Sequence, residues 1–304
     1  MLIWVVYTLL SAFFFGLKDI VAKRLFREDM DPKQVVFEEF LLFLVLVLVL
    51  FFPLVEFSSF IFLWELYLLK AFAVAFAQIS YLRMLKKYDL STVSPLLNLS
   101  PLVLLVLSSI FLSEYISLVQ FIGILIIIGS TYFLEVTIHH HRKEVPHKFH
   151  ISDLKQKKFG FYILAFCTIF LFSLAALTDS LILDIVNVYT NLYFTSIIVF
   201  LVSIGYYLYE GEFKKVCKNV FYQPQTMIIS IFAILSNFLI LLAIAVPGAL
   251  VSLIIPLRRT STLISSLAGG ILFHEKHIKE KFIATIFMLI GVILIVSTGS
   301  IPIE

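Results

Sequence analysis

The chain has 304 residues, of which 61% are hydrophobic and only 14% are charged, with a formal net charge of +3 at pH 7. A soluble globular protein has about 45–50% apolar and about 25% charged residues, so this composition predicts an integral membrane protein. With only 2 cysteines and a small net charge, it excludes a disulfide-rich secreted domain, a disordered chain and a nucleic-acid-binding protein with a large basic face.

Apolar runs of about 20 residues are what a helix needs to cross a hydrocarbon core about 30 Å thick. The runs here are continuous rather than alternating, which excludes a β-barrel. We therefore predict an all-α integral membrane protein with ten transmembrane helices. In chain order these helices are 2–22, 34–55, 64–85, 91–112, 115–135, 159–182, 187–209, 225–246, 249–272 and 277–298.

The first and third predicted helices each have a feature that is unusual for a transmembrane helix. Residues 2–17 resemble the core of a signal peptide but have no preceding basic region and no Ala-x-Ala cleavage site, so we expect a retained helix. The third contains Lys70 and Arg83, and we expect both side chains to lie near its ends and reach the headgroups. The eighth and ninth helices are separated at Pro247-Gly248, a helix-breaking pair.

Lysine and arginine lie almost entirely in the connections after the first, third, fifth, seventh and ninth predicted helices. By the positive-inside rule these connections are cytoplasmic and both termini lie outside. We therefore predict a multi-pass protein of the plasma membrane.

The polar segment 136–158 divides the chain into a first half, residues 1–135, and a second half, residues 159–304. Five histidines lie in it, and such a tract can bind a divalent metal. We interpret the segment as a basic, solvated cytoplasmic linker and predict no metal site and no cofactor. The histidines are His139, His140, His141, His147 and His150.

The two halves carry landmarks at the same spacing. Pro95 and Glu114 are 19 residues apart, and so are Pro256 and Glu275. Each half therefore has five helices built to one plan. Because five is an odd number, the second copy crosses the membrane in the opposite direction. This is an inverted-topology repeat, which places a substrate near the midplane between the halves.

Over its whole length the chain resembles the EamA-type branch of the drug/metabolite transporter superfamily. The shared features are a proline in the fourth helix of each half, a turn that carries glutamate, and glycines in the fifth helix at Gly123, Gly129 and Gly291. The resemblance implies a secondary transporter. Members carry amino acids, other metabolites, drugs, nucleotide sugars or phosphorylated sugars, so the cargo stays open. Many relatives have cytoplasmic termini, whereas the charges here predict the reverse.

Arg258 and Arg259 lie near the middle of the ninth predicted helix, just after Pro256. A charge at that depth costs about 2.5–3.5 kcal/mol or more, and neighbouring positions diverge by about 100° around a helix. We expect one arginine to bind an anionic group of the substrate and the other to pair with a carboxylate. The pair resembles the Lys-Arg pair in the ninth helix of organophosphate-carrying members. The alternative is a wholly internal pair held by Asp19, Asp179, Glu38 or Glu39.

Four acidic residues are candidates for gating or proton coupling. Asp19 and Asp179 hold equivalent positions in the two halves, although Asp19 has Lys23 four residues on as a simple partner. Glu38 and Glu39 open the second helix, where the plain alternative is stabilisation of the helix N-terminus. We expect Glu114 and Glu275 to be structural.

Uncharged polar groups near mid-span complete the predicted substrate site. They must find partners in the membrane, and hydrogen bonds between helices serve as well as a substrate does. These candidates are Gln78, Tyr81, Asn98 and Asn237.

Our leading prediction is a secondary transporter that moves a small polar metabolite with an anionic group, such as an amino acid, organic acid or organophosphate, by alternating access. We predict no enzyme and no catalytic residues, since the phosphate-binding loop, His-Glu-x-x-His and Gly-x-Ser-x-Gly motifs are missing. The alternatives are an enzyme acting on a lipid phosphate, a multidrug exporter, and a channel or scaffold. The expected partners are the substrate, the bilayer and a coupling proton or counter-substrate, with no nucleic acid; a homodimer is left open.

Overall fold

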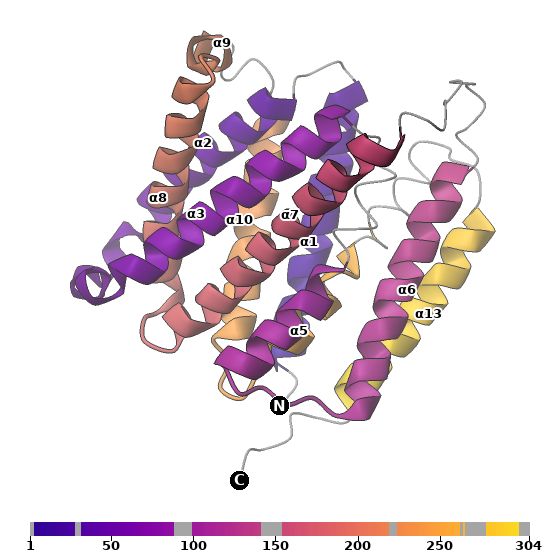
Figure 1. The fold of residues 1–304 in the computed structure, drawn as a ribbon. Helices are drawn as coiled ribbons and strands as arrows, with labels where there is room; N and C mark the ends of the chain where they lie inside the picture. The colour runs from indigo at the N-terminus through magenta and orange to yellow at the C-terminus, as the bar shows by residue number, and fades with distance from the viewer. Residues whose placement is uncertain are drawn as a thin grey trace.

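The computed structural model describes residues 3–27, 32–87, 99–140, 154–218, 224–261, 264 and 278–297. These ranges are helical and contain no β-strand, so the all-α prediction is confirmed (Figure 1). The first-half helices are α1 (Ile3–Arg27), α2 (Pro32–Phe51), the 3-10 turn η1 (Phe52–Leu54), α3 (Phe57–Lys87), α5 (Ser100–Phe111) and α6 (Leu118–His140). The later helices are α7 (Leu154–Leu183), α8 (Val188–Tyr209), α9 (Phe213–Lys218), α10 (Gln225–Ile244), α11 (Val251–Arg258) and α13 (Ile278–Ser297).

Each of the ten predicted ranges contains a described helix, while the short helix α9 was not predicted. Five helices are long and apolar enough to cross a membrane: α1, α2, α7, α8 and α10. The apolar parts of α5, α6 and α13 that the structure describes are shorter. The count of ten crossings therefore remains a prediction.

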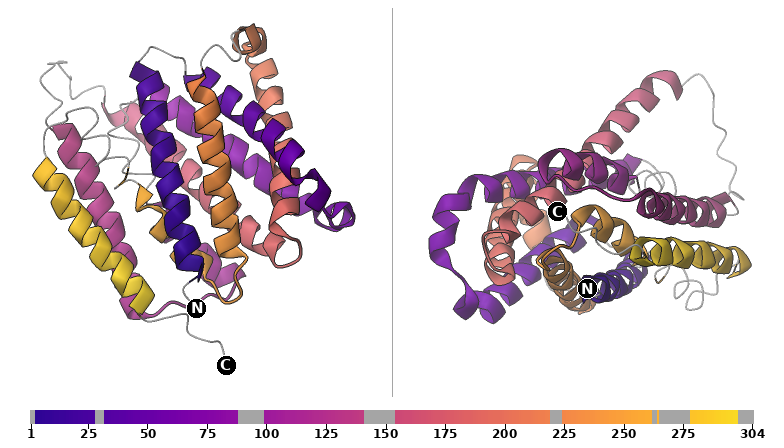
Figure 2. Two further views of the ribbon diagram at one scale, coloured as in Figure 1. Left: turned by 180° about the vertical axis from the view of Figure 1, so that it is seen from behind. Right: turned by 90° about the horizontal axis from the view of Figure 1, so that it is seen from below.

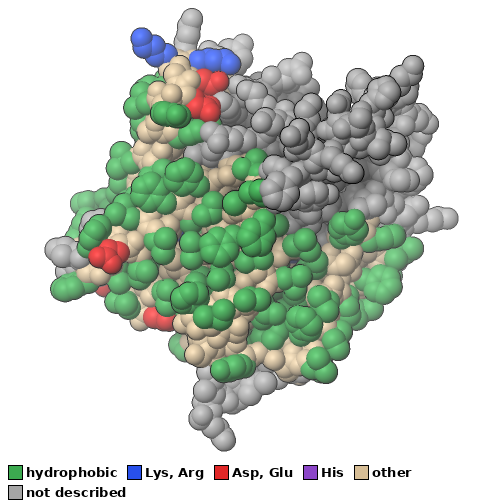
Figure 3. Space-filling view, in the orientation of Figure 1, with side chains coloured by type: hydrophobic (Ala, Val, Ile, Leu, Met, Phe, Trp, Pro, Cys, Tyr) green, Lys and Arg blue, Asp and Glu red, His purple; other side chains and the backbone are tan. Residues whose placement is uncertain are grey.

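The outer surface of the helices is apolar. Val49, Phe62 and Leu118 are 72%, 84% and 74% exposed, as expected for side chains that face lipid. Figure 3 shows hydrophobic side chains over most of one face, with lysines gathered at the end that carries α9. Buried small residues on α3 let neighbouring helices approach it closely. They are Ala71, Ala73, Ala75 and Ala77.

Helices from before and after the linker pack against one another. α1 lies along α10, α3 along α7 and α8, α2 against α8 and α10, and α6 along α13 (Figures 1 and 2). The short helix α11 contacts α1, α5, α6, α7 and α10. The core is therefore formed mainly between the halves rather than within each one.

Two serines hold the middle of α1 against α10. The Ser11 hydroxyl donates to the Ser236 carbonyl oxygen at 2.8 Å, and the Ser236 hydroxyl donates to the Ser11 carbonyl oxygen at 2.9 Å. Both side chains are fully buried, and reciprocal bonds of this kind join helices where water is excluded.

A glycine pair marks the crossing of α6 and α13. A Cβ atom added to Gly123 would lie 2.8 Å from the carbonyl oxygen of Gly291, and the reverse distance is also 2.8 Å. The helices therefore touch backbone to backbone at this point. Gly129, on the same helix, has no atom within 4 Å of an added Cβ.

The expectation that Lys70 reaches the headgroups is wrong. α3 begins at Phe57, seven residues before the predicted start, so Lys70 lies well inside the helix. Its side chain is 4% exposed and forms an ion pair with Asp179 of α7.

Candidate substrate-binding site

Arg258 is the last residue of the short helix α11, and Arg259 is the residue that follows it. The first turn of α11 is held by Glu114, whose two carboxylate oxygens accept hydrogen bonds from the backbone N–H groups of Val251 at 2.7 Å and Ser252 at 3.0 Å. Pro256 lies inside the helix, which ends at Arg258. A helix N-terminus favours a carboxylate and a C-terminus favours cations, so the charges at both ends suit α11. Glu114 thus has the structural role expected of it.

Arg258 reaches towards α1 and α10. Its guanidinium carbon lies 4.8 Å from the centre of the Phe15 ring, a cation–π distance. Its Nη2 atom donates to the Ser236 hydroxyl at 3.1 Å and to Oδ1 of Asn237 at 3.4 Å. The structure therefore brings together two of the predicted substrate-binding residues, Arg258 and Asn237.

A second cation lies against the same aromatic ring. Nζ of Lys18 is 5.1 Å from the centre of the Phe15 ring and 2.7 Å from Oε1 of Glu39. The lysine and the glutamate are both partly buried. We name Phe15, Lys18, Glu39, Asn237 and Arg258 the Phe15 cluster. The sequence interpretation selected three of its members but not Phe15 or Lys18.

A glycine explains why α1 comes so close to the end of α11. A Cβ atom added to Gly16 would lie 2.8 Å from Cβ of Ile264 and 2.9 Å from the carbonyl oxygen of Ser261. Gly16 therefore allows α1 to lie close to the residues that follow α11.

Arg259 extends in another direction, as expected for neighbouring helical positions. Its Nη2 atom donates a short hydrogen bond to the hydroxyl of Ser100, the first residue of α5. The Ser100 carbonyl oxygen in turn accepts a bond from Ser173 of α7 at 3.0 Å. Arg259 therefore contacts the junction of α5 and α7, and Arg258 that of α1 and α10.

Asp179 belongs to a separate polar group near the turn from α7 to α8. Besides its ion pair with Lys70, its Oδ1 atom accepts a bond from Nδ2 of Asn191 at 2.9 Å. Nζ of Lys70 also donates to Oδ1 of Asn191 at 2.9 Å and to the Thr195 hydroxyl at 2.8 Å. We name Lys70, Asp179, Asn191 and Thr195 the Lys70 site. The sequence showed no cation near Asp179 because Lys70 is more than a hundred residues away along the chain.

The other candidates lie elsewhere. Glu38 is fully buried and accepts a bond from Nε2 of Gln34 at 3.0 Å. Gln78 lines a small crevice between α2, α3 and α8 rather than the Phe15 cluster. Tyr81 is partly buried on α3. Asn98 and the Asp19 side chain fall outside the part of the chain that the structure describes.

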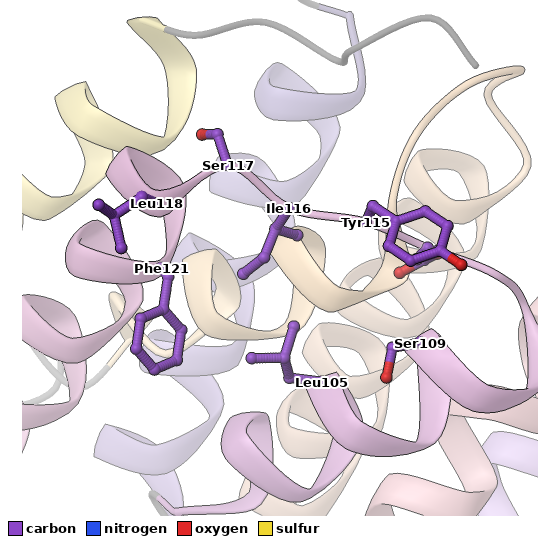
Figure 4. A pocket seen from close by; sticks show the side chains of 8 residues that line it. Leu105, Ser109, Tyr115, Ile116, Ser117, Leu118 and Phe121 are labelled. Carbon is purple, nitrogen blue, oxygen red and sulfur yellow. The ribbon is translucent and has the colours of Figure 1, made fainter. Parts of the chain in front are cut away.

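A pocket of about 400 Å³ opens where α5 meets α6 (Figure 4). None of the predicted substrate residues lines it. The lining side chains come from the end of α5, the turn and the start of α6, and they are Leu105, Ser109, Glu114, Tyr115, Ile116, Ser117, Leu118 and Phe121.

Comparison with known proteins supports the resemblance seen in the sequence. The model of the EamA-like transporter family matches residues 2–136. This match covers less than half of the chain. Together with the helices that are long and apolar enough to cross a membrane, it indicates a multi-pass membrane protein. No curated protein matches the sequence.

Similarity to a known fold extends over nearly the whole chain. A solved crystal structure superposes with a TM-score of 0.74, covering 97% of this chain and 96% of its own, at 11% sequence identity. Identity this low shows a shared fold alone.

Proposed function

We propose that this EamA-like transporter is a secondary carrier that moves a small polar metabolite with an anionic group by alternating access. The observation that carries the proposal is the Phe15 cluster, in which Arg258 and Lys18 flank one aromatic ring. The cluster lies beside Ser236, near the middle of α10. Mid-membrane charges are costly and mark substrate or ion paths in many membrane proteins.

The chemistry of the cluster suits a small organic anion. The planar guanidinium of Arg258 can bind a carboxylate or a phosphate through two parallel hydrogen bonds. Lys18 adds a second cation, Asn237 adds an amide, and Phe15 adds an apolar surface. Glu39 holds Lys18 at 2.7 Å, so we propose that it positions the lysine and contributes to gating as its neighbours move.

For alternating access we propose two inverted repeats, residues 1–135 and 159–304, joined by the linker 136–158. The contacts between halves support this because they occur in equivalent pairs. If α1, α2, α3, α5 and α6 correspond to α7, α8, α10, α11 and α13, the α1–α10 contact corresponds to α3–α7. The α1–α11 contact likewise corresponds to α5–α7, and α2–α10 to α3–α8. Equivalent helices also meet each other: α2 with α8, α5 with α11, and α6 with α13.

We further propose that the protein lies in the plasma membrane with its basic connections in the cytoplasm. The exposed Lys214 and Lys215 of α9 support this orientation, because they lie at the opposite end of the molecule from the start of α1 (Figure 1). The driving force would be a proton gradient or an exchanged substrate.

Thermal unfolding of the purified protein tests the site. Glutamate, succinate and glucose 6-phosphate represent three anion classes, and tetraphenylphosphonium represents lipophilic cations. A ligand that binds the native state at a hundredfold excess over its Kd stabilises it by about 2.7 kcal/mol. We expect at least one anion to raise the Tm of the parent and of Arg259→Ala, but not of Arg258→Ala.

Two outcomes would contradict the proposal. One is that the cation stabilises the parent while none of the three anions does. The other is that Arg258→Ala keeps the full response to an anion that stabilises the parent.

A further inference from the structure

The Lys70 site surrounds one ammonium group with oxygen atoms from two helices. The Asp179 carboxylate comes from α7, and Oδ1 of Asn191 and the Thr195 hydroxyl come from α8, at 2.9 and 2.8 Å from Nζ of Lys70. Asn191 also donates to Asp179, and Thr195 donates to Asn191 at 3.1 Å, so the oxygens are themselves held in place. An acidic oxygen set of this kind is suited to a monovalent cation.

The cation in this site is tethered to the other half of the molecule. Lys70 projects from α3, which precedes the linker, whereas all three oxygen ligands follow the linker. The ion pair between Lys18 of α1 and Glu39 of α2, by contrast, lies within the first half. The Lys70 site is therefore a charged contact between halves.

Further contacts between halves lie at the same end of the molecule. The backbone N–H of Glu56 donates to the Thr190 hydroxyl at 2.9 Å, and Nδ2 of Asn187 donates to Oε1 of Glu56 at 2.7 Å. Phe51 packs on Tyr189 with ring centres 5.5 Å apart. Together with the Lys70 site, these contacts close the α7–α8 end between the two halves.

We propose that Asp179, Asn191 and Thr195 form a monovalent-cation site occupied by the tethered ammonium of Lys70, and that this occupancy keeps the α7–α8 end closed. The closing role rests on the alternating-access carrier proposed above, whereas the cation site does not. Parting α3 from α7 and α8 separates two opposite charges in a medium of low dielectric constant, so intermediate arrangements are disfavoured. The contact is either made or broken, as a gate requires.

Replacement of the tethered cation tests the site directly. Lys70→Ala removes the ammonium but leaves its oxygen ligands, so we expect the purified variant to unfold at a lower temperature than the parent. Methylammonium or ethylammonium chloride should then raise the Tm of Lys70→Ala more than choline chloride at equal ionic strength. The parent should show no such difference, and Lys70→Ala/Asp179→Asn should lose the response.

The cation site would be refuted if neither amine stabilised Lys70→Ala beyond choline, or if the double variant responded equally. If Lys70→Ala does not fold, Lys70→Met/Asp179→Asn provides a neutral pair of similar volume. Rescue of folding by that pair shows that the unpaired Asp179 was the cause, whereas failure of both variants would contradict the proposal.

The proposed role of the Lys70 site in keeping the α7–α8 end closed needs a separate measurement. A reporter variant, Tyr189→Cys in a Cys167→Ser/Cys217→Ser background, reports opening through its rate of maleimide labelling in detergent. We expect Asp179→Asn to raise this rate about tenfold or more, because loss of one partner from a buried pair is strongly destabilising. Asp184→Asn is the matched control, since it removes the same charge from an exposed position five residues along.

An unchanged labelling rate in Asp179→Asn would refute the closing role. Binding of anions at the Phe15 cluster is measured independently by the Tm panel, so failure of the gate and failure of the carrier can be told apart.

Discussion

Glu114 stabilises the N-terminus of α11, the end of the helix opposite to Arg258. Its carboxylate belongs to the first half, yet it accepts hydrogen bonds from the first two backbone N–H groups of α11, the helix that ends at Arg258 and is followed by Arg259. Hydrogen bonds to a charged group contribute about 1.5–3 kcal/mol each. The position and the length of α11 therefore depend on this carboxylate.

We predict that Glu114→Gln lowers the free energy of unfolding by about 1.5–3 kcal/mol. The amide keeps the shape of the side chain but loses the negative charge and one of the two acceptor oxygens. Thermal or denaturant unfolding of the purified protein measures the change. Glu65→Gln on the exposed face of α3 is the control; equal stability of Glu114→Gln and the parent would show that the cap contributes nothing.

The sequence predicted some members of the polar clusters and not others for a physical reason. Arg258 and Asn237 were identified because a charged or amide group at mid-span is costly unless it has a partner or a role. Lys70 was not selected, because its long side chain was expected to reach the headgroups, and nothing in the sequence marked Lys18. Their true surroundings depend on contacts between helices that are distant along the chain.

At the scale of the helices, the crossing of α6 and α13 depends on two glycines. We predict that Gly123→Ala or Gly291→Ala destabilises the protein by about 1–3 kcal/mol, the typical cost of overpacking. The reason is that at either position the new methyl group would lie 2.8 Å from the carbonyl oxygen of the opposite glycine, a backbone atom that cannot rotate away, and would also crowd neighbouring side chains.

Gly129→Ala is the matched control for this crossing, because it lies on the same helix with open space around an added Cβ. Its Tm should equal or exceed that of the parent, since alanine favours a helix over glycine. Equal losses at all three glycines would mean that helix propensity or lipid contact, and not the crossing, sets the effect.

The helix ranges could be predicted because they depend on local hydrophobicity and length. α8, for example, lies within one residue of its predicted limits, and α10 lies within two. Two helices depart clearly from their predicted ranges. α3 begins at Phe57, because the expected start excluded serines and aromatic residues that the helix includes. α11 ends at Arg258, just after Pro256, although the predicted helix ran from 249 to 272, because proline weakens the backbone hydrogen bonds of a helix. Hydropathy marks the apolar section of a helix and not where its hydrogen bonds begin.

At the scale of the whole molecule, the sequence predicted an all-α membrane protein from composition and from uncharged runs. It did not predict which helices meet, because the exposed and buried faces of membrane helices are both apolar and differ mainly in side-chain size. Ala71 and Phe72 are neighbours on α3, yet the first is fully buried and the second is exposed to lipid. The contacts between halves, including the Phe15 cluster and the Lys70 site, therefore had to come from the structure.

The central claim is that this EamA-like protein carries an anionic metabolite through a site built around Arg258. Counterflow in proteoliposomes tests it most directly, with radiolabelled glutamate, succinate or glucose 6-phosphate outside and the same unlabelled compound inside. We expect at least one of the three to accumulate transiently above its equilibrium level with the parent and with Arg259→Ala. Protein-free liposomes and Arg258→Ala should show no accumulation; equal counterflow by Arg258→Ala and the parent, or none with any of the three anions, would contradict the account.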